Sequence, residues 1–431
     1  MKAAFHTLGC KVNQYETESL KEQFRKAGYE IVPEEEIADV YVINTCTVTN
    51  LADRKSRQFI RRAHRRNPEA IVAATGCYVQ MNPEDALALE GVSVIAGNSE
   101  KKTLPALVEA YRKDQKKRTR VRAYHELTEY EDTGLIEAME SRSRAFVKIE
   151  EGCNRFCSYC IIPYARGVVR SRPQDEILAE VEGLVAKGFR EVVLTGINTA
   201  LYGTEHGGEG IAPLLAALEE MPGDFRVRLS SLEPTVIDES YVRRLLPFTR
   251  LCHHLHLSVQ SGSDTVLKRM NRRYDRAEYL KIVETLRAFD PQYGITTDII
   301  VGFPGETEEE FRDSLRIVQE AGLSRVHAFR YSMRAGTKAA AMPDQIPSAV
   351  KAERAERLIA FAAEQEQRFL EGCRGQTRRV LFERIDPESG LACGYTDNYV
   401  MVYADGADRI GQFGDCKLLG EYKDGMRGEL V

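Results

Sequence analysis

A repeated order of strand-like and helix-like segments constrains the fold of this 431-residue chain. In the first hundred residues, an apolar run, a polar turn and an amphipathic segment follow one another three times. From about residue 144 to 331 the same alternation occurs six times. Strands that alternate with helices form parallel sheets whose faces the helices cover. We therefore predict an α/β protein with two successive parallel-sheet regions.

Each of the three N-terminal apolar runs ends in a cysteine. AAFHTLGC ends at Cys10, VYVINTC at Cys46 and AIVAATGC at Cys77. Parallel strands bring their carboxyl ends to one edge of the sheet, where α/β proteins bind ligands. Three buried core thiols are the alternative, since cysteine is often buried. Because all three lie at equivalent strand ends, we favour a shared binding site.

The six central strands are too few for a closed eight-fold barrel. They predict an open, partial (β/α)6 barrel with its site at the strand carboxyl ends. The last sixty residues change to short β-like runs broken by Gly and Asp, which indicates a small all-β barrel of a kind that holds nucleic acid. The predicted strands of the partial barrel are AFVKIE (145–150), EVVLTG (191–196), RVRLSS (226–231), HLHLSV (254–259), ITTDIIVG (295–302) and RVHAFRYS (325–332).

These patterns divide the chain into four segments. We predict an N-terminal α/β domain over 1–112, a charged linker over 113–138, the partial barrel with its following helix over 139–370, and the all-β barrel over 372–431. No apolar run reaches the length of a membrane span, and the first residues do not form a signal peptide. We therefore expect a cytoplasmic protein without a membrane partner. Ten cysteines in a reducing compartment indicate metal binding or catalysis.

The stretch EGCNRFCSYC holds Cys153, Cys157 and Cys160 within eight residues, directly after the first strand of the partial barrel. Tetrahedral zinc and cubane iron–sulfur sites both take four ligands. A zinc ion would need a fourth ligand from elsewhere, such as His125 or His206. A cubane held by three cysteines leaves one iron open to a small molecule. We favour the cubane, with a substrate or cofactor as the fourth ligand.

The spacing Cys-x3-Cys-x2-Cys in this position resembles the radical S-adenosylmethionine (SAM) superfamily. The resemblance implies that Cys153, Cys157 and Cys160 hold a catalytic [4Fe–4S] cluster whose open iron binds SAM. It also implies that Tyr159 lies beside the adenine. Polar residues at the mouth of the partial barrel could hold the rest of the cofactor. These cofactor-binding candidates are Thr195, Gly196, Glu233, Gln260 and Asp298.

Nearly the whole chain resembles the methylthiotransferases within that superfamily. The resemblance rests on TLGCKVNQYETE, INTCTVT, ATGCYVQ, EGCNRFCSYCIIPYARGVVRSR, FPGET and a C-terminal stretch similar to the RNA-binding TRAM module. It implies a second [4Fe–4S] cluster on Cys10, Cys46 and Cys77. One SAM would methylate a sulfur on that cluster, and a second would give the radical that removes hydrogen from an unactivated carbon. An external one-electron donor of the flavodoxin or ferredoxin type would be needed. We expect a monomer.

The form CKVNQYETE around Cys10 looks most like enzymes that act on N6-threonylcarbamoyladenosine. That resemblance implies transfer of a methylthio group to C2 of this base, next to the anticodon, with the tRNA anticodon stem-loop as partner. The alternatives are isopentenyladenosine in tRNA and a ribosomal-protein residue. A non-catalytic RNA-binding protein with structural metal sites is the alternative from another class.

The charge pattern gives mixed support for RNA. The predicted helix DRKSRQFIRRAHRR carries seven basic residues, which suits phosphate binding but also a solvated helix face. From Gly372 onward, eight Lys and Arg face ten Asp and Glu, fewer cations than a phosphate-gripping barrel should have. A local patch around Arg374, Arg378 and Arg379 could compensate. Arg166, Arg170 and Arg172 could pair with SAM, with RNA or with acids on the first helix. The seven basic residues of the helix are Arg54, Lys55, Arg57, Arg61, Arg62, Arg65 and Arg66.

Overall fold

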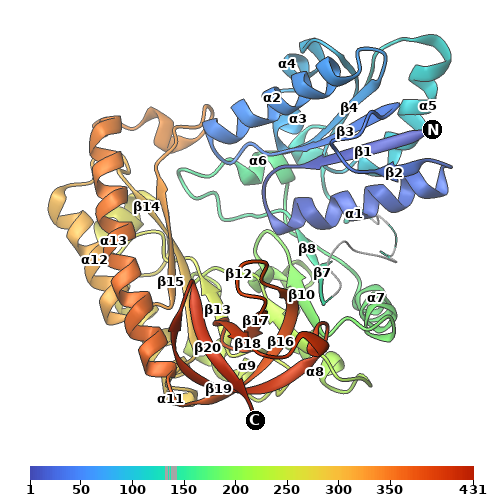
Figure 1. Ribbon diagram of the computed structural model, residues 1–431. Coiled ribbons are helices and arrows are strands. Elements are labelled where there is room, and N and C mark those ends of the chain that lie inside the picture. Colours follow the sequence, from blue (N-terminus) through green and yellow to red (C-terminus); the bar gives the residue numbers. More distant parts are fainter. Residues whose placement is uncertain (132–133, 135, 137–142) are drawn as a thin grey trace. The chain divides into compact units, whose positions relative to one another are not determined.

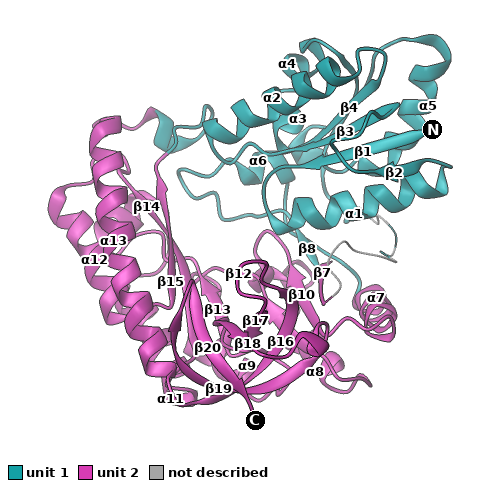
Figure 2. Ribbon diagram, viewed as in Figure 1, with its two compact units in different colours: residues 1–139, 148–173, 332–340 teal, residues 140–147, 174–331, 341–431 magenta. Residues whose placement is uncertain are grey.

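The computed structural model describes residues 1–431 except 132–133, 135 and 137–142. The chain forms two compact units (Figure 2). Unit 1 comprises residues 1–139, 148–173 and 332–340, and unit 2 comprises 140–147, 174–331 and 341–431. Unit 1 therefore contains both groups of three cysteines, Cys10/Cys46/Cys77 and Cys153/Cys157/Cys160. The predicted segment boundaries stay predictions, because the two units group the chain in another way.

Unit 1 is built on a six-stranded parallel sheet in the order β2-β1-β3-β4-β5-β6 (Figure 1). Its strands are β1 (Lys2–Thr7), β2 (Glu30–Val32), β3 (Val40–Thr45), β4 (Ile71–Gly76), β5 (Val92–Ala96) and β6 (Arg118–Arg120). Its helices are α1 (Lys11–Lys26), α2 (Asn50–Arg66), α3 (Cys77–Met81), α4 (Pro83–Ala88), α5 (Leu104–Asp114) and α6 (Ile162–Arg166). The short strands β8 (Glu150–Glu151) and β9 (Arg170–Ser171) pair with each other.

Helices cover both faces of this sheet, as the alternating pattern predicts. On one face, Ile60 and Ala63 of α2 pack with Val79 of α3 against the strands. On the other face, Phe24 of α1 and Val108 of α5 do the same. The central strands are buried on both sides, which explains their nearly continuous apolar sequences.

Unit 2 contains the partial barrel. Its strands are β7 (Arg144–Lys148, the last residue belonging to unit 1), β10 (Glu191–Thr195), β11 (Arg226–Leu229), β12 (Ser231–Leu232), β13 (His254–Leu257), β14 (Gly294–Val301) and β15 (Arg325–Arg330). They form the sheets β11-β10-β7 and β12-β13-β14-β15. Hydrogen bonds between Val227 and residues 250 and 252 link β11 to the segment before β13. The helices are α7 (Gln174–Ala186), α8 (Ala212–Glu219), α9 (Glu239–Leu245), α10 (Asp264–Arg269), α11 (Arg276–Phe289), α12 (Glu308–Glu320) and α13 (Ser348–Cys373).

The C-terminal residues close into a five-stranded barrel, β16-β17-β18-β20-β19. Helix α13 leads into the barrel, and its Phe369 and Cys373 join the barrel core. The strands are β16 (Thr377–Ile385), β17 (Ala392–Thr396), β18 (Met401–Ala404), β19 (Phe413–Tyr422) and β20 (Gly425–Leu430).

This architecture confirms the predicted fold class: an N-terminal parallel-sheet region, a partial barrel and a small all-β barrel. All six predicted central strands are present. Thr307 and Glu310 form a capping box that opens α12. Three strands of the six-stranded sheet, β2, β5 and β6, were not predicted. One of them, β6, falls within the segment interpreted as a linker and extends the sheet by pairing with β5.

Candidate active site

The first three cysteines lie at the carboxyl ends of adjacent parallel strands. Cys10 is the N-cap of α1 just beyond β1, Cys46 directly follows β3, and Cys77 is the first residue of α3 directly after β4. Strand β3 pairs with both β1 and β4. The segment before Cys10 lies against Cys46, since a Cβ on Gly9 would lie 3.1 Å from Cys46 Sγ. The predicted convergence of these cysteines at one sheet edge is therefore present in the structure.

Two glycines allow the cysteine loops to approach one another. Gly76 has φ +95°, and a Cβ at this position would lie 2.3 Å from the carbonyl oxygen of Thr45. Gly9 has φ +108°, and its Cβ would lie 3.0 Å from the Cβ of Cys46. Only glycine adopts such a conformation readily and leaves this space free. The Gly-Cys pairs thus place Cys10 and Cys77 against the loop that carries Cys46.

Asparagine side chains tie these loops together. The Asn13 amide donates to the carbonyls of Leu8, at 2.6 Å, and Thr45, at 3.1 Å. The Asn98 amide nitrogen lies 3.6 Å from Cys77 Sγ and donates to the carbonyl of Ala165 at 2.7 Å. These bonds use buried amides to fix the backbone that carries the thiols.

A buried network of five charged side chains lies beside the cysteines. Arg166 Nη1 contacts Glu16 Oε1 at 2.9 Å and Glu151 Oε1 at 2.5 Å, and its Nη2 donates to Asn13 Oδ1 at 2.6 Å. Lys148 Nζ lies 2.7 Å from Glu151 and 3.3 Å from Glu16, and Lys101 Nζ lies 2.9 Å from Glu16. Three cations and two carboxylates leave one positive charge in excess.

The network stays ionised although water is excluded. Burial disfavours the charged Glu16 carboxylate, but the charges of Arg166, Lys101 and Lys148 outweigh burial and hold its pKa well below the ordinary value. The network reaches the cysteines through Asn13, which accepts from Arg166 and whose Oδ1 lies 3.9 Å from Cys10 Sγ. The excess positive charge therefore faces the thiols, where it complements an anionic group.

The thiols themselves are poor acids in this setting. Burial raises the pKa of Cys46 to about 12. Burial also raises the pKa of Cys10, although Arg166 opposes this shift. Cysteines ligate metals as thiolates, and a bound metal supplies the positive charge that removes the proton. Three soft sulfur donors, a pre-shaped loop and a cationic backing therefore fit an anionic iron–sulfur cluster.

The second group of cysteines is held mainly by backbone bonds. The Cys153 amide donates to the carbonyl of Gly167 at 3.0 Å, and the Cys160 amide donates to that of Cys157 at 2.9 Å. A Cβ on Gly152 would lie 1.9 Å from a carbonyl oxygen, so only glycine can precede Cys153 here. Cys157 is buried, and Cys153, Cys160 and the predicted adenine neighbour Tyr159 are half-buried.

Among the described residues, no three His, Cys, Asp or Glu side chains converge on a point suited to a single metal ion. A cubane cluster does not require such convergence, because each thiolate binds a different iron at a separate corner. Each group of three cysteines would leave one iron for a ligand that the protein does not supply. The donor sets thus fit [4Fe–4S] clusters better than single ions.

The strand-end residues predicted to hold SAM lie in unit 2. Thr195 ends β10 and is buried, and Gly196 follows it. Glu233, just after β12, accepts from Arg272 at 2.8 Å and from Asn198 at 3.0 Å. These two bonds fix the Glu233 carboxylate, which has two oxygens and therefore keeps further acceptor positions.

Gln260 and Asp298 lie together at the next two strands. Gln260 has φ +66°, its amide donates to the Asp298 carbonyl at 2.8 Å, and its carbonyl accepts from Ile300. The Asp298 carboxylate lies 3.2 Å from His256 Nε2. Burial disfavours its charge, but the hydrogen bond and charge of His256 outweigh burial and lower the pKa of Asp298. An ionised Asp298 can accept hydrogen bonds from a ligand hydroxyl or amine.

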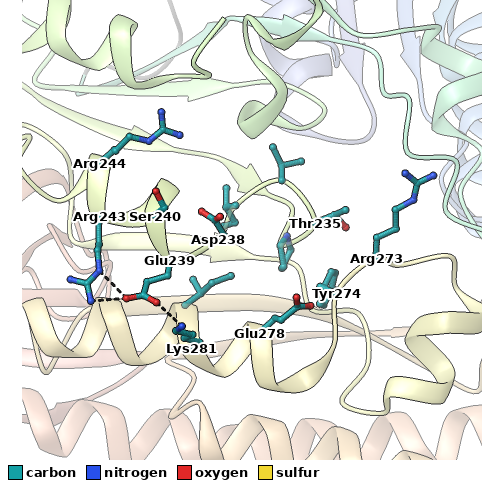
Figure 3. A pocket seen from close by; sticks show the side chains of 14 residues that line it. Thr235, Asp238, Glu239, Ser240, Arg243, Arg244, Arg273, Tyr274, Glu278 and Lys281 are labelled. Atoms are coloured by element: carbon teal, nitrogen blue, oxygen red, sulfur yellow. Dashed lines mark hydrogen bonds and ion pairs between the residues drawn. The ribbon is translucent and has the colours of Figure 1, made fainter. Parts of the chain in front are cut away.

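The residues that follow Glu233 in the chain line a cavity of about 730 Å³ (Figure 3). Its wall carries four cations and three acids, and Glu239 pairs with both Arg243, at 2.8 Å, and Lys281, at 2.9 Å. In Figure 3, the guanidinium groups of Arg244 and Arg273 point away from this ion-paired group. Because the acids offset all but one of these positive charges, the cavity does not favour a polyanion.

Comparisons with known proteins identify the family of the chain. Residues 147–318 match the radical SAM superfamily, residues 2–97 match the uncharacterized protein family UPF0004, and residues 371–431 match the TRAM domain. A Bacillus subtilis protein named threonylcarbamoyladenosine tRNA methylthiotransferase MtaB is 42% identical over 421 residues, covering 96% of this chain and 93% of that protein. This chain belongs to the radical SAM methylthiotransferase family.

Other relatives of this methylthiotransferase carry two different names. An Aquifex aeolicus MtaB is 40% identical and covers 96% of this chain and 98% of its own length. A tRNA-2-methylthio-N(6)-dimethylallyladenosine synthase of Carboxydothermus hydrogenoformans is 35% identical and covers 99% of this chain and 98% of its own length. The methylthiotransferase uses SAM and two [4Fe–4S] clusters, as predicted. The ligand sets Cys10/Cys46/Cys77 and Cys153/Cys157/Cys160 stay predictions that the geometry supports.

Solved structures share the fold of the methylthiotransferase at low sequence identity. The radical SAM methyltransferase TsrM of Kitasatospora setae, with cobalamin and a [4Fe–4S] cluster bound, superimposes with a TM-score of 0.60 at 15% identity, over 79% of this chain and 77% of that one. The cobalamin-dependent enzyme OxsB gives 0.52 at 12% identity, over 84% and 56%. No helix in the described part of the chain is long and apolar enough to cross a membrane.

Around the first group of cysteines, the structure adds two buried side chains that sequence reasoning did not select, Asn13 and Glu16. The third alternative for Arg166 is the observed one, since it pairs with Glu16 on the first helix. Arg172 donates to Tyr15 of the same helix, and Arg170 donates to backbone carbonyls. Asn13 and Glu16 lie within the motif CKVNQYETE, but their buried contacts with residue 166 depend on the tertiary fold.

Proposed function

We propose that this methylthiotransferase transfers a methylthio group to C2 of N6-threonylcarbamoyladenosine next to the tRNA anticodon. The observation that carries the proposal is the 42% identity, over nearly the full length, with a relative named for that substrate. The dimethylallyladenosine enzymes, at 35% identity, make the corresponding tRNA base the second candidate. A cytoplasmic location, a monomeric state and a one-electron donor of the flavodoxin or ferredoxin type belong to the same proposal.

The residues of this chain suit a two-site reaction. When bound, the clusters and SAM supply a transferable sulfur, a methyl group and a carbon-centred radical. Arg166 and its buried partners would hold positive charge against the group on Cys10, Cys46 and Cys77. The backbone bonds of the Cys153 loop fix the second group of thiols. Acid–base catalysis alone would not suffice, because an aromatic C–H is not acidic enough for a side-chain base.

Within unit 2, the strand-end residues would orient SAM. The buried Glu233 and the ionised Asp298 can accept from its amine and ribose hydroxyls, and Thr195 and Gly196 leave space at the mouth of β10. We also propose that Tyr159 packs against the adenine. These roles rest on the position of each residue at a strand end or in the cysteine loop.

Mass spectrometry of the nucleosides in bulk tRNA tests the substrate. Deleting the gene should remove the methylthio form of threonylcarbamoyladenosine, while the base without the methylthio group accumulates. The gene should restore it, whereas Cys157→Ala or Cys77→Ala should not. Cys393→Ala is the matched control, because this buried thiol lies in the C-terminal barrel, and it should restore the modified base.

Other outcomes contradict the proposal in distinguishable ways. Loss of a methylthio dimethylallyladenosine would establish the second candidate. An unchanged nucleoside profile would exclude tRNA and direct the search to a methylthio mass on ribosomal proteins.

A further inference from the structure

Helix α2 carries the densest group of cations without acidic partners in the described chain. Its buried side, Ser56, Ile60 and Ala63, packs against the sheet. The other sides bear seven Lys and Arg residues and a single acid, Asp53, which pairs with Arg334 at 2.7 Å. The seven cations, called the α2 cations below, are Arg54, Lys55, Arg57, Arg61, Arg62, Arg65 and Arg66.

None of the α2 cations is paired with a carboxylate of the described residues. Arg57 lies over the ring of Tyr78, Arg62 lies over that of Phe59, and Arg66 donates to a backbone carbonyl. The other four α2 cations are exposed, and no described residue forms a hydrogen bond, ion pair or ring contact with them. Like charges three and four residues apart on a helix repel one another. This repulsion is not relieved within the described chain.

The cations of α12 and of the arginine patch in the C-terminal barrel are compensated. On α12, Arg316 pairs with Glu309 and Asp313, and Arg312 lies 3.4 Å from Glu308. In the C-terminal barrel, the patch predicted to contact RNA is used internally. Arg378 pairs with Asp290 at 2.8 Å, Arg379 with Asp224 at 2.8 Å and Arg374 with Glu371 at 3.2 Å. The unpaired charge is therefore concentrated on α2 rather than on the barrel.

The spacing of the α2 cations forms two stripes along the helix. Arg54, Arg61 and Arg65 follow one another at i, i+7 and i+11, opposite the buried Ala63, and Lys55, Arg62 and Arg66 repeat this spacing one residue later. At 1.5 Å per residue, each stripe spans about 16 Å. The helix begins four residues after Cys46, so the stripes lead away from the first group of cysteines (Figure 1).

We propose that the α2 cations bind the sugar–phosphate backbone of the RNA substrate and supply most of its electrostatic affinity. This inference rests on the proposed tRNA function. Six of the seven α2 cations are arginines, whose planar fork matches phosphate oxygens with two hydrogen bonds. A membrane surface suits α2 less well, because interfacial helices insert an apolar face, and the apolar face of α2 is used by the sheet.

Binding of the full-length protein to a fluorescently labelled tRNA anticodon stem-loop, measured by anisotropy over a range of salt concentrations, tests this inference. The variant Arg54→Gln/Arg61→Gln/Arg65→Gln should bind about 100-fold more weakly at 0.1 M salt. The slope of log K against log[salt] should lose about 2–3 in magnitude. Because these side chains are exposed, the thermal midpoint should not fall.

The matched control removes three arginines that have acidic partners, Arg312→Gln/Arg316→Gln/Arg357→Gln. It should change RNA affinity by less than about threefold and leave the salt slope intact. If the α2 variant binds RNA like the wild type with the same slope, the inference is wrong. It is also wrong if the α2 variant loses binding to vesicles of anionic lipid but keeps binding RNA.

The outcome separates this inference from the proposed function. If the wild-type protein modifies tRNA in cells and the α2 variant binds RNA with unchanged affinity, only the role of α2 is overturned. A wild-type protein that neither binds the stem-loop nor alters tRNA nucleosides would overturn both. If the α2 variant binds RNA more weakly but reaches the wild-type turnover rate at saturating RNA, the result supports α2 as a docking surface outside the reacting groups.

Discussion

Each unit buries a network of three cations and two carboxylates, yet the two networks end on different partners. In unit 2, Glu191 binds Arg226 at 2.6 Å and Arg228 at 2.9 Å, and Arg144 lies between Glu191 and Glu383. The remaining guanidinium donors bond to backbone carbonyls of the C-terminal barrel, at residues 379 and 395–397. In unit 1, Arg166 donates instead to Asn13 at 2.6 Å, and Asn13 Oδ1 lies 3.9 Å from Cys10 Sγ.

The difference shows how the same charge count serves two purposes. Glu191 and carbonyl oxygens of the barrel both accept hydrogen bonds from Arg226 and Arg228, so this network joins the barrel to the partial-barrel sheet. Burial disfavours the Glu191 charge, but Arg228 and Arg226 outweigh it and lower the pKa of Glu191. The unit 1 network ends beside the Cys10 loop, because Asn13 contacts both Arg166 and Cys10. Its excess positive charge therefore lies next to a predicted cluster ligand, which connects this network with cluster binding.

Replacing Arg166 should break the unit 1 network with the largest effect. Arg166→Met leaves two buried carboxylates short of a partner, and the free energy of unfolding should fall by about 3–5 kcal/mol. In a background without Cys153, Cys157 and Cys160, the iron content of the purified protein and the reduction potential of the remaining cluster report on the cysteines of unit 1. We expect less iron and a lower potential, because a nearby cation favours the reduced, more negative cluster.

Arg166→Lys keeps the charge and is the control for this change. It should recover part of the stability and potential, although lysine lacks the second donor that reaches Asn13. A variant Arg166→Met with full iron content and an unchanged potential would show that the network only supports the fold.

Replacing Arg228 tests the unit 2 network in the same way. Arg228→Met removes a buried partner of Glu191 and two bonds to barrel carbonyls, so the free energy of unfolding should fall by about 3 kcal/mol. Iron content should stay at the wild-type level, since this network contacts no cysteine of the two cluster motifs. Chemical denaturation and iron analysis measure the two effects. The exposed Arg243, which pairs with Glu239, provides the control, and Arg243→Met should cost less than about 1 kcal/mol. Loss of iron in Arg228→Met would remove the distinction between the networks.

Sequence reasoning reached the features that local patterns encode. Strand and helix periodicity gave the partial barrel, and the apolar runs that end in cysteine placed Cys10, Cys46 and Cys77 at one sheet edge. Strands β2, β5 and β6 were not predicted, because β2 and β6 are only three residues long and β5 follows a broken helix pattern. Such strands are stabilised by pairing with a neighbour, which a single segment does not reveal.

The buried networks could not be predicted for a related reason. Arg166 and Glu16 are separated by 150 residues, and the sequence allowed SAM, RNA and acidic partners for this arginine. The sequence alone shows that the C-terminal barrel has fewer cations than acids. Which of its arginines were free depended on Asp224 and Asp290, far away along the chain. Pairing over long sequence separation decides whether a cation is structural or available to a ligand.

The smallest expected effect concerns pH and the Asp290–Arg378 pair between α11 and the barrel. Burial disfavours the Asp290 charge, but hydrogen bonds from His253 and Arg378 outweigh burial and lower its pKa. A carboxyl whose pKa is lowered on folding stabilises the protein above its unfolded pKa of about 3.9, and this contribution is lost as the pH falls through the folded pKa. Asp290→Asn should therefore cost about 1–3 kcal/mol at pH 7, and the difference from the wild type should shrink below about pH 4. Urea denaturation of both proteins between pH 7 and pH 3 measures this difference. If the difference in unfolding free energy between the two proteins stays constant over that range, the Asp290–Arg378 pair contributes through packing and not through charge. Arg378 would then contribute less to holding the barrel against α11 than the arginines of the Glu191 network contribute to holding it against the partial-barrel sheet.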